Sequence, residues 1–389
     1  MAYQGVDYYH IDELLTDEEK LIRDSVREWV SAKVIPVIEE QYRNATFPFH
    51  LVPEMAELGL FGPTLPEEFG GAGIGDVAYG LAMQELERGD SGMRSFASVQ
   101  SALVMYPIYT FGSDQQKKTW LPKLARAEVV GAFGLTEPDY GSDPGSMITT
   151  AKKVDDGYLL SGAKMWITNS SIADIFVVWA KLDGVIHGFL VEKGAKGLST
   201  PETKGKWSLR ASVTGEIVFD DVFVPEGMMF PRTDGLKAPL MCLNQARYGI
   251  AWGVVGAAMA CYDSAINYTH ERVQWGGPIA RHQMIQERLV EMLTGITQGQ
   301  LMTWRLGRMK EKGEASFRHV SLAKRNNCRM ALEVARTARD LHGANGITDE
   351  YPIMRHMMNL ESVYTYEGTH NMHTLIVGAD ITGIEAYGR

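Results

Sequence analysis

The chain has 389 residues, of which 45% are hydrophobic and 22% charged, and its 38 Lys and Arg against 48 Asp and Glu give a formal net charge of −10. This length exceeds one compact core, so two or three domains are expected, and the composition excludes a disordered or membrane protein. The lack of any basic run argues against nucleic acid as the main partner. No stretch reaches the roughly 20 apolar residues of a membrane span, so no membrane insertion is expected.

The three cysteines, Cys242, Cys261 and Cys328, are widely separated and none belongs to a CxxC pair. They are expected to be buried free thiols in a reducing compartment. The N-terminus carries acidic residues and no apolar segment of a leader, so no signal or transit peptide is predicted. A cytoplasmic location is therefore expected.

Residues 1–128 are predicted to form an N-terminal helical domain. Thr16 followed by Glu19 is a capping box that begins a helix, and apolar residues recur behind it at helical spacing. Further helices are expected over 49–60, 77–88 and 94–109, and after a cap at Ser113.

The pattern changes to short β-rich runs separated by turns over residues 129–236, which predicts a small antiparallel sheet or barrel. After Pro239 the helical pattern returns, and the short connections predict an antiparallel four-helix bundle within 237–389. The predicted fold is therefore an α+β multidomain protein with a β domain between two helical ones. The helices expected in the last part cover about 242–271, 282–312, 316–343 and 351–387.

A candidate catalytic residue lies in the stretch YTYEGTH, residues 364–370, between two helix-like runs. Gly368 marks a helix break, and Glu367 is the last side chain before it, flanked by aromatic rings rather than basic residues. A poorly solvated carboxylate has a raised pKa and can work as a base. On this segment alone, a surface glutamate at a helix end is the favoured interpretation, and the other motifs reverse it.

Two runs in the β region combine features suited to a flat, hydrogen-bonding ring. The first, FGLTEPDYGSD over 133–143, has a glycine, a threonine hydroxyl and a Pro-Asp-x-Gly turn. The second, KMWITN over 164–169, adds an aromatic plate and another hydroxyl. Trp166 would cover a face of the ring and the threonines would meet its polar atoms. The alternative for the first run is an ordinary strand followed by a turn.

These two runs, together with RVQWGGP over 272–278 and YEGT over 366–369, resemble the acyl-CoA dehydrogenase family. The four motifs occur in the family's order, across its three domains, and span nearly the whole chain. The sequence is most similar to the glutaryl-CoA dehydrogenase branch, on the evidence of residues 133–147, 209–212, 244–253 and 366–369.

The resemblance implies FAD between the β domain and the C-terminal bundle, with Thr136 and residues 166–168 around the isoalloxazine ring. A partner subunit would supply Arg272, Gln274 and Trp275 to the pyrophosphate and adenosine. Trp275 stands where the family usually has phenylalanine, and residues 342–344 depart from its usual double glycine. The full set of cofactor-binding residues expected is Phe133, Leu135, Thr136, Gly141, Ser142, Trp166, Ile167, Thr168, Arg272, Gln274, Trp275, Gln283, Gly343, Asn345, Gly346, Thr369 and Asn371.

By the same resemblance, Glu367 is the base that removes the α-proton of a thioester, and its backbone N–H and a flavin hydroxyl stabilise the enolate oxygen. A hydride then leaves the β-carbon for the flavin. No metal site is expected, because His370 and His373 are three residues apart but no further ligand completes a site.

The residues implied at the substrate are Arg94, Ser95, Ser98, Glu87, Tyr366 and Arg247. Arg94 matches the arginine that binds the distal carboxylate in the glutaryl-CoA branch, although the residues alone favour an ordinary capping turn with solvated charges. Arg247 would approach either the CoA phosphates or the helix of the catalytic glutamate, and an interhelical salt bridge explains it equally well.

The predicted reaction is the FAD-dependent oxidation of glutaryl-CoA, followed by decarboxylation of glutaconyl-CoA to crotonyl-CoA and CO₂. Glu87 and Tyr366 favour this decarboxylating type. The resemblance implies electron-transfer flavoprotein as electron acceptor and a homotetramer, a dimer of dimers. The alternatives are a dehydrogenase of another dicarboxylyl-CoA such as a substituted succinyl-CoA, a non-decarboxylating glutaryl-CoA dehydrogenase, and a non-catalytic flavin or acyl-CoA binder.

Overall fold

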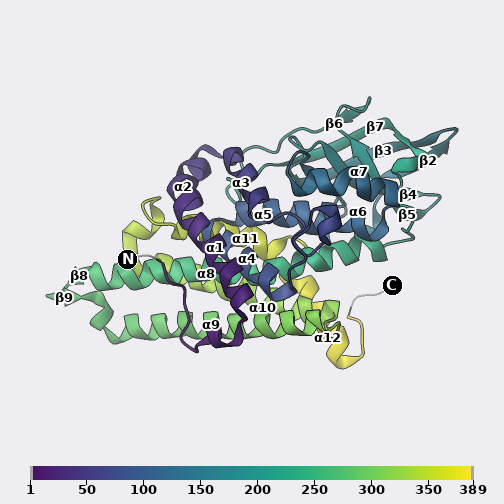
Figure 1. Cartoon of the computed structure of the whole chain (residues 1–389). Helices are drawn as coiled ribbons and strands as arrows, with labels where there is room; N and C mark the ends of the chain where they lie inside the picture. The colour runs from purple at the N-terminus through teal and green to yellow at the C-terminus, as the bar shows by residue number, and fades with distance from the viewer. Residues whose placement is uncertain (1–2, 387–389) are drawn as a thin grey trace.

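A computed structural model describes residues 3–386, which form a helical region, a sheet and a set of long helices (Figure 1). The capping boxes expected at the helix starts are present: the Glu19 N–H donates to Thr16 Oγ1 at 3.3 Å, and Ser113 caps in the same way. The helices of the first region are α1 Asp17–Trp29, α2 Ile35–Asn44, α3 Val52–Glu57, α4 Asp76–Gly89, α5 Ser91–Ser98, α6 Tyr106–Phe111 and α7 Asp114–Ala125.

Two of these helices differ from the sequence prediction. The helix expected over 49–60 is shorter, because α3 begins only where Pro53 occupies its first turn, a position that needs no N–H donor. The helix expected over 94–109 begins earlier, at Ser91, because the Asp90 side chain accepts the N–H of Gly92 and caps it. A wider π-type turn over Val99–Met105 joins α5 to α6.

The middle region is a seven-stranded sheet with the order β1-β4-β2-β3-β7-β6, and β5 pairs with β4. Most neighbours are antiparallel as predicted, but β4 runs parallel to both β1 and β2. The strand considered as the alternative for the run from Phe133 is present as the end of β1. The sequence pattern did not reveal β2, whose centre is Ala-Lys-Lys, residues that are depleted in strands. The strands are β1 Gly131–Gly134, β2 Thr150–Val154, β3 Gly157–Thr168, β4 Ile175–Leu182, β5 Val185–Glu192, β6 Leu198–Ser199 and β7 Thr214–Pro225.

The central strand β4 divides the sheet between two apolar clusters. Val177 and Trp179 pack on the large cluster that the sheet shares with the helices. Phe176 and Val178, which alternate with them, pack on a separate cluster of the sheet's other face. Successive side chains of a strand point to opposite faces, so the sheet is buried on both sides at this strand.

The last region consists of long antiparallel helices, as the sequence predicts. The first begins at Lys237 rather than near 242, since Pro239 lies in its first turn. The last ends at Thr382 before Gly383, whose φ of 71° is typical of a helix end, and the predicted end at Tyr387 lies outside the described residues. The elements are α8 Lys237–Glu271, β8 Val273–Gln274, β9 Gly277–Pro278, α9 Gln283–Glu311, α10 Phe317–Leu341, α11 Ile353–Thr365 and α12 His370–Thr382.

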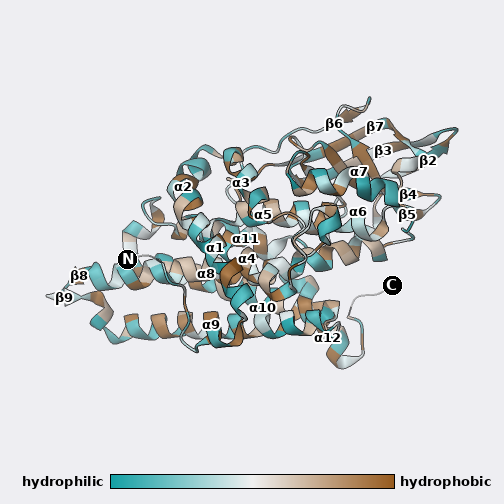
Figure 2. Cartoon of the chain, viewed as in Figure 1, coloured by the Kyte–Doolittle hydropathy of each residue, from teal (hydrophilic) through white to brown (hydrophobic). Residues whose placement is uncertain are grey.

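Helix α8 is the central element of this region. It is long and apolar enough to cross a membrane by length and composition alone, but 72% of its apolar window is buried inside the fold, as for a core helix. Its glycines allow close packing on α4, because a Cβ at Gly256 would lie 1.8 Å from the Gln84 carbonyl oxygen. By contrast, hydrophobic and hydrophilic turns alternate along α9 in Figure 2, which is typical of an outer helix.

Candidate active site

The turn between α11 and α12 holds the predicted catalytic glutamate in an unusual backbone conformation. Glu367 has φ 50° and Gly368 has φ 90°, so two successive residues are left-handed. Glycine adopts this region readily, whereas other residues reach it at a cost of roughly 1–3 kcal/mol when the surroundings enforce it. The predicted helix break at Gly368 is therefore present, and the surrounding structure imposes a specific direction on Glu367.

The carboxyl group of Glu367 is buried on one side. Its Oε2 atom is out of contact with solvent and has no hydrogen-bond partner among the described residues. Burial raises the pKa of this carboxyl, and the positive charges of Arg94, Lys324 and Arg247 oppose the rise only in part. The raised pKa agrees with the sequence prediction, but the local sequence showed only aromatic neighbours and missed these three cations, which come from distant helices.

Two of these cations bind the backbone of the turn. Arg247 Nε donates to the Glu367 carbonyl oxygen at 2.7 Å. Lys324 Nζ donates to the carbonyl oxygens of Tyr366 at 2.6 Å and Gly368 at 2.8 Å. Of the two positions considered for Arg247, the structure therefore shows the one beside the catalytic glutamate.

Sequence reasoning missed Lys324, although a signal was available. On α10 the buried positions include Val320, Asn327 and Ala331, and Lys324 lies on the same helical stripe. A lysine on an otherwise buried stripe needs partners inside the protein. Such a lysine is therefore a candidate for contact with a polar site.

Arg94 forms a buried ion pair at the predicted distal end of the substrate. Its side chain is 1% exposed, and its Nε donates to Glu87 Oε2 at 2.6 Å. Its guanidinium also donates to the Tyr366 hydroxyl. Gly253 leaves room for the pair, because a Cβ there would lie 2.1 Å from Glu87 Oε2. The predicted Arg94, Glu87 and Tyr366 are thus brought together from three separate segments.

Further polar atoms point toward the same place without good partners. The hydroxyls of Tyr79 and Ser98 are buried and face each other, and neither makes a hydrogen bond of good geometry among the described residues. The charges of Arg94 and Glu367 both influence the pKa of Tyr79, so Tyr79 lies in their neighbourhood. Buried polar atoms are normally paired, so this group resembles a ligand site more than a packed core. Ser95, also predicted here, is buried on α5 beside Ser98.

Tyr79 was not among the predicted residues. It lies on α4 at helical spacing from Glu87, eight residues away, and both are buried. The same spacing that places Glu87 at the site therefore places Tyr79 there, two turns earlier.

The two predicted ring-binding runs lie side by side in the sheet region. The Met165 N–H donates to the Thr136 carbonyl at 2.9 Å. Beneath them, the buried ammonium of Lys164 donates to Glu137 Oε1 at 2.8 Å and to the Leu135 carbonyl at 3.1 Å. This buried ion pair ties the first run to the second.

An aromatic plate is exposed at this place. A bulge in β3 between Lys164 and Ile167 turns Trp166, whose φ is 63°, away from the hydrogen-bonded pairing of β3 with β7. Trp166 is 57% exposed. Thr136 and Thr168 are partly exposed, so the surroundings fit a flat ring with polar edges. The side chains of three other predicted cofactor residues are buried, which leaves only their backbone atoms for a ligand: Phe133, Leu135 and Ile167. Gly141 and Ser142 are exposed on the loop after β1.

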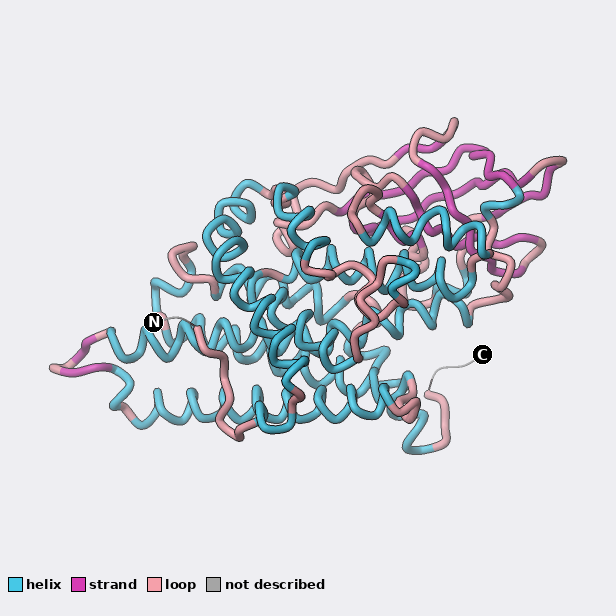
Figure 3. The backbone as a smooth tube through the Cα atoms, viewed as in Figure 1, coloured by secondary structure: helices cyan, strands magenta, loops and turns pink. Residues whose placement is uncertain are grey.

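Most of the remaining predicted cofactor residues form a second group at the opposite end of the molecule. Arg272 caps the end of α8, and Trp275 lies in the hairpin β8–β9 that follows. The turn Gly343–Ile347 contacts the same end of α8, since Asn345 Nδ2 donates to the Tyr268 hydroxyl at 3.2 Å. Helix α8, whose 35 residues make it about 50 Å long, runs from the sheet region to this group (Figure 3). The two groups therefore lie far apart within one chain.

The side chains of this second group are available to a ligand. Trp275 is 82% exposed, and Arg281 donates to its carbonyl oxygen at 2.5 Å. Gln283 and Gly343 are exposed as well, Gln274 is partly exposed and Gly346 is buried. An exposed tryptophan beside an arginine is a suitable surface for a nucleotide base and phosphates.

Thr369 and Asn371 lie at the start of α12. The Thr369 hydroxyl accepts the Met372 N–H at 3.1 Å and caps the helix, and Asn371 is exposed. His370 stacks on Tyr364 with ring centroids 4.6 Å apart. Within residues 3–386 no group of three or more His, Cys, Asp or Glu side chains is arranged to hold a metal ion.

Comparison with known proteins decides the family. Models of the acyl-CoA dehydrogenase N-terminal, middle and C-terminal domains match residues 16–128, 132–222 and 233–382. The chain belongs to the acyl-CoA dehydrogenase family. This membership confirms the predicted three-domain fold and makes the chain an FAD-dependent oxidoreductase of acyl-CoA thioesters.

Three similar proteins are glutaryl-CoA dehydrogenases. A crystal structure from Mycobacterium smegmatis is 49% identical, with a TM-score of 0.97, covering 99% of this chain and 100% of that chain. A second structure from that organism, in complex with FADH2, is 44% identical with the same coverage and TM-score. The protein of Desulfococcus multivorans is 34% identical over 386 residues, 96% of this chain and 99% of that protein.

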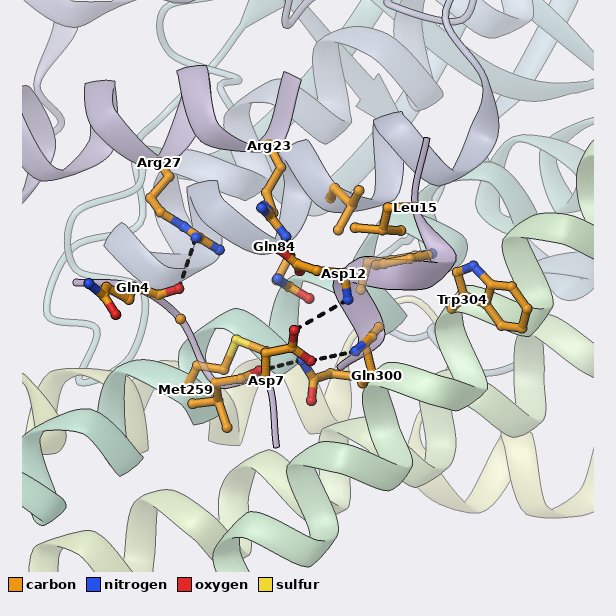
Figure 4. A pocket seen from close by; sticks show the side chains of 15 residues that line it. Gln4, Asp7, Asp12, Leu15, Arg23, Arg27, Gln84, Met259, Gln300 and Trp304 are labelled. Atoms are coloured by element: carbon orange, nitrogen blue, oxygen red, sulfur yellow. Dashed lines mark hydrogen bonds and ion pairs between the residues drawn. The ribbon is translucent and has the colours of Figure 1, made fainter. Parts of the chain in front are cut away.

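A small cavity elsewhere in this acyl-CoA dehydrogenase does not belong to the site. It lies under the N-terminal segment between α1, α4, α8 and α9 (Figure 4), and none of the predicted site residues lines it. Its volume of about 50 Å³ suits one or two water molecules. Some of its polar groups are paired, since Gln300 Nε2 donates to the Val6 carbonyl at 2.7 Å and Arg27 donates to that of Gln4 at 3.0 Å, while Gln300 Oε1 has no partner among the described residues. This cavity lies where the N-terminal segment packs on the helices.

Proposed function

We propose that this acyl-CoA dehydrogenase oxidises glutaryl-CoA and then decarboxylates the product to crotonyl-CoA and CO₂. The observation that carries the proposal is that the buried Arg94 meets the Glu367 turn through the Tyr366 hydroxyl. A cation for a carboxylate and a base for a thioester α-proton thus lie at one site. The similarity to several glutaryl-CoA dehydrogenases supports the same substrate.

Arg94 has the means to bind the distal carboxylate of the substrate. Its Nε is used by Glu87 and one terminal nitrogen by Tyr366, while the other terminal nitrogen makes no hydrogen bond among the described residues. Because Glu87 neutralises the guanidinium, a carboxylate needs further donors, and the unpaired hydroxyls of Tyr79 and Ser98 supply them. Hydrogen bonds between charged groups are about twice as strong as neutral ones.

Glu367 has the properties of the base. Its carboxyl is buried, its pKa is raised toward the working range, and the three surrounding cations keep its ionised form accessible. The Glu367 N–H has no acceptor among the described residues and is available to the thioester oxygen that becomes negative when the α-proton leaves. Bound FAD supplies the acceptor for the hydride of the β-carbon.

The second step follows from the first. Oxidation places the distal carboxylate on a carbon conjugated with the thioester, so loss of CO₂ leaves a carbanion delocalised onto the thioester oxygen. That carbanion must gain one proton, and protonated Glu367 carries the proton removed earlier. Glu87 weakens the hold of Arg94 on the carboxylate by sharing its guanidinium, which favours departure of neutral CO₂ from the site.

The proposal includes assembly and electron acceptor. Because the two groups of cofactor residues lie at opposite ends of one chain, a second copy of this chain is needed to complete each FAD site, in keeping with the predicted homotetramer. Electron-transfer flavoprotein is proposed as the acceptor, and a cytoplasmic location stays a prediction.

The test is product analysis of the purified holoenzyme with glutaryl-CoA and a ferricenium acceptor. The proposal predicts bleaching of the flavin and formation of crotonyl-CoA with CO₂. Bleaching with glutaconyl-CoA as the end product would identify a non-decarboxylating enzyme. No bleaching with glutaryl-CoA, but bleaching with a substituted succinyl-CoA, would identify the other dicarboxylyl-CoA as substrate. Flavin that no acyl-CoA reduces would identify a binder.

A further inference from the structure

The turn that carries Glu367 is held at three successive carbonyl oxygens by cationic side chains. Lys324 donates to the carbonyls of Tyr366 and Gly368, and Arg247 donates to the carbonyl between them, that of Glu367. Lysine and arginine reach the turn from α10 and α8. An exposed turn would bind water at these positions, so the arrangement is specific to this place in the fold.

Lys324 is wholly enclosed at this position. Its residue is 1% exposed, and burying an ammonium group is costly unless it is paired. Its two hydrogen-bond acceptors are neutral carbonyls, so Glu367 is the anion that balances its charge. Burial lowers the pKa of Lys324 to about 8, and the charge of Glu367 acts in the opposite direction. The groups that face Lys324 are Glu367 and Tyr366 from the turn, Arg247 from α8, Arg94 from α5, Cys328 on α10 itself, and His370 and His373 from α12.

The contact with Tyr366 determines where the Glu367 N–H points. The Tyr366 carbonyl and the Glu367 N–H belong to one planar trans peptide, so they point in opposite directions. Lys324 holds the carbonyl, and the N–H on the other side has no acceptor among the described residues. A cation on the carbonyl also polarises the peptide, which makes its N–H a stronger donor. Arg247 acts on the next peptide and cannot replace this contact.

We propose that Lys324 is a positioning residue: by holding the carbonyls of Tyr366 and Gly368, it fixes Glu367 in its left-handed conformation with carboxylate and N–H both directed at the thioester. The ammonium group also lowers the pKa of the Glu367 carboxyl. This inference rests on the proposed role of Glu367 as the base.

The experiment distinguishes the role of Glu367 as base from the positioning role of Lys324, and it uses an assay that measures proton removal without hydride transfer. The probe is 3-thiaglutaryl-CoA, in which sulfur replaces the β-carbon, so that α-proton exchange in D₂O reports on proton removal alone. The holoenzymes compared are wild type, Lys324→Met, Lys324→Gln and Glu367→Gln. Lys310→Met is the matched control, because this lysine pairs with Asp76 on α4, away from the turn. Flavin absorbance and the melting temperature report on folding.

For Lys324→Met, exchange is expected to fall by roughly tenfold to a thousandfold with little change in KM, because a misdirected base and N–H lower the rate of the step rather than binding. In this variant the acid limb of the pH profile of the exchange rate moves to higher pH, because the pKa of Glu367 rises without the nearby ammonium group. Lys324→Gln keeps donors for the carbonyls but no charge, so its limb also moves up while its rate falls less. Lys310→Met behaves as wild type.

Wild-type exchange and an unmoved acid limb in Lys324→Met would overturn the inference. If Lys324→Met does not fold with bound flavin, the pH profile of exchange in Lys324→Gln decides. An acid limb at the wild-type pH contradicts the inference, and an acid limb at higher pH supports it. The base assignment fails separately, if Glu367→Gln exchanges the α-proton at the wild-type rate.

Discussion

The Arg94 guanidinium donates to the Tyr366 hydroxyl across 272 residues of sequence. Because Tyr366 directly precedes Glu367, this contact fixes the distance between the proposed carboxylate clamp and the proposed base. This hydrogen bond is one of several between the N-terminal and C-terminal helical regions, which are also joined by the ion pairs of Arg355 with Asp90 and of Lys310 with Asp76. On the proposed function, a substrate that reaches both Arg94 and Glu367 must match their spacing.

Glu367→Gln is expected to retain FAD and its yellow colour but to lose flavin reduction by glutaryl-CoA, by at least roughly 10³-fold. The amide keeps the size of the side chain and cannot accept the α-proton. Stopped-flow absorbance under anaerobic conditions measures the rate. Glu361→Gln is the control, because Glu361 lies exposed on α11, where its carboxylate pairs with Arg336. Reduction at the control's rate in Glu367→Gln would show that another group is the base.

Arg94→Gln is expected to lower kcat/KM for glutaryl-CoA by roughly 100-fold or more and to affect butyryl-CoA much less, since a charge-assisted bond is lost only with the dicarboxylyl substrate. Removing Arg94 leaves Glu87 as an unpaired buried charge, which itself destabilises the protein. The double variant Arg94→Gln with Glu87→Gln has no unpaired buried charge, so it is the better protein in which to compare glutaryl-CoA with butyryl-CoA. Equal losses with the two substrates would show that Arg94 does not bind the distal carboxylate.

The sequence predicted the fold through strong periodic signals, and the family motifs led to Glu367, Arg94 and Glu87. Helical spacing marks Lys324 and Tyr79 as buried polar residues, but it does not give their partners, which lie far away in the chain. Strand β2 escaped prediction because its pairing with β3 and β4, more than its own residues, makes it a strand. Only the packing of the helices against one another, which local sequence patterns do not encode, shows that the side chains of Lys324 and Tyr79 lie at the site.

Gly253→Ala is expected to impair the Arg94 clamp while leaving the overall fold intact. A Cβ there would lie 2.1 Å from Glu87 Oε2 and 3.2 Å from Arg94 Nε, so the ion pair must shift. Alanine otherwise favours a helix over glycine by about 1 kcal/mol. The ratio of glutaryl-CoA to butyryl-CoA turnover should therefore fall.

Gly378→Ala is the matched control, because Gly378 lies in α12 and, apart from the backbone of that helix and the adjacent residues, no atom of residues 3–386 lies within 4 Å of an added Cβ. This control should be unchanged in activity and slightly more stable. An unchanged substrate ratio in Gly253→Ala, measured with both CoA esters at equal flavin content, would contradict the clamp's dependence on this glycine.

The raised pKa of Glu367 makes a prediction about stability. Because the folded pKa exceeds that of the unfolded chain, the protonated carboxyl favours folding, and this contribution is complete below the unfolded pKa of about 4.5. It is lost as the pH rises through the folded pKa, so at neutral pH ionised Glu367 destabilises the protein. Glu367→Gln, which stays neutral, should therefore melt higher than wild type at pH 7 to 8, by roughly 1–3 °C.

The difference should vanish as the pH approaches 4.5, since both proteins then carry a neutral side chain at this position. Thermal melts of the ligand-free holoenzymes across this pH range measure it, and Glu361→Gln should show no such pattern because Glu361 is half exposed. A melting temperature of Glu367→Gln below wild type at pH 8 would mean that the three cations stabilise the carboxylate more than burial disfavours it. That result would place the pKa of Glu367 below its ordinary value and remove the physical basis for its role as a base near neutral pH.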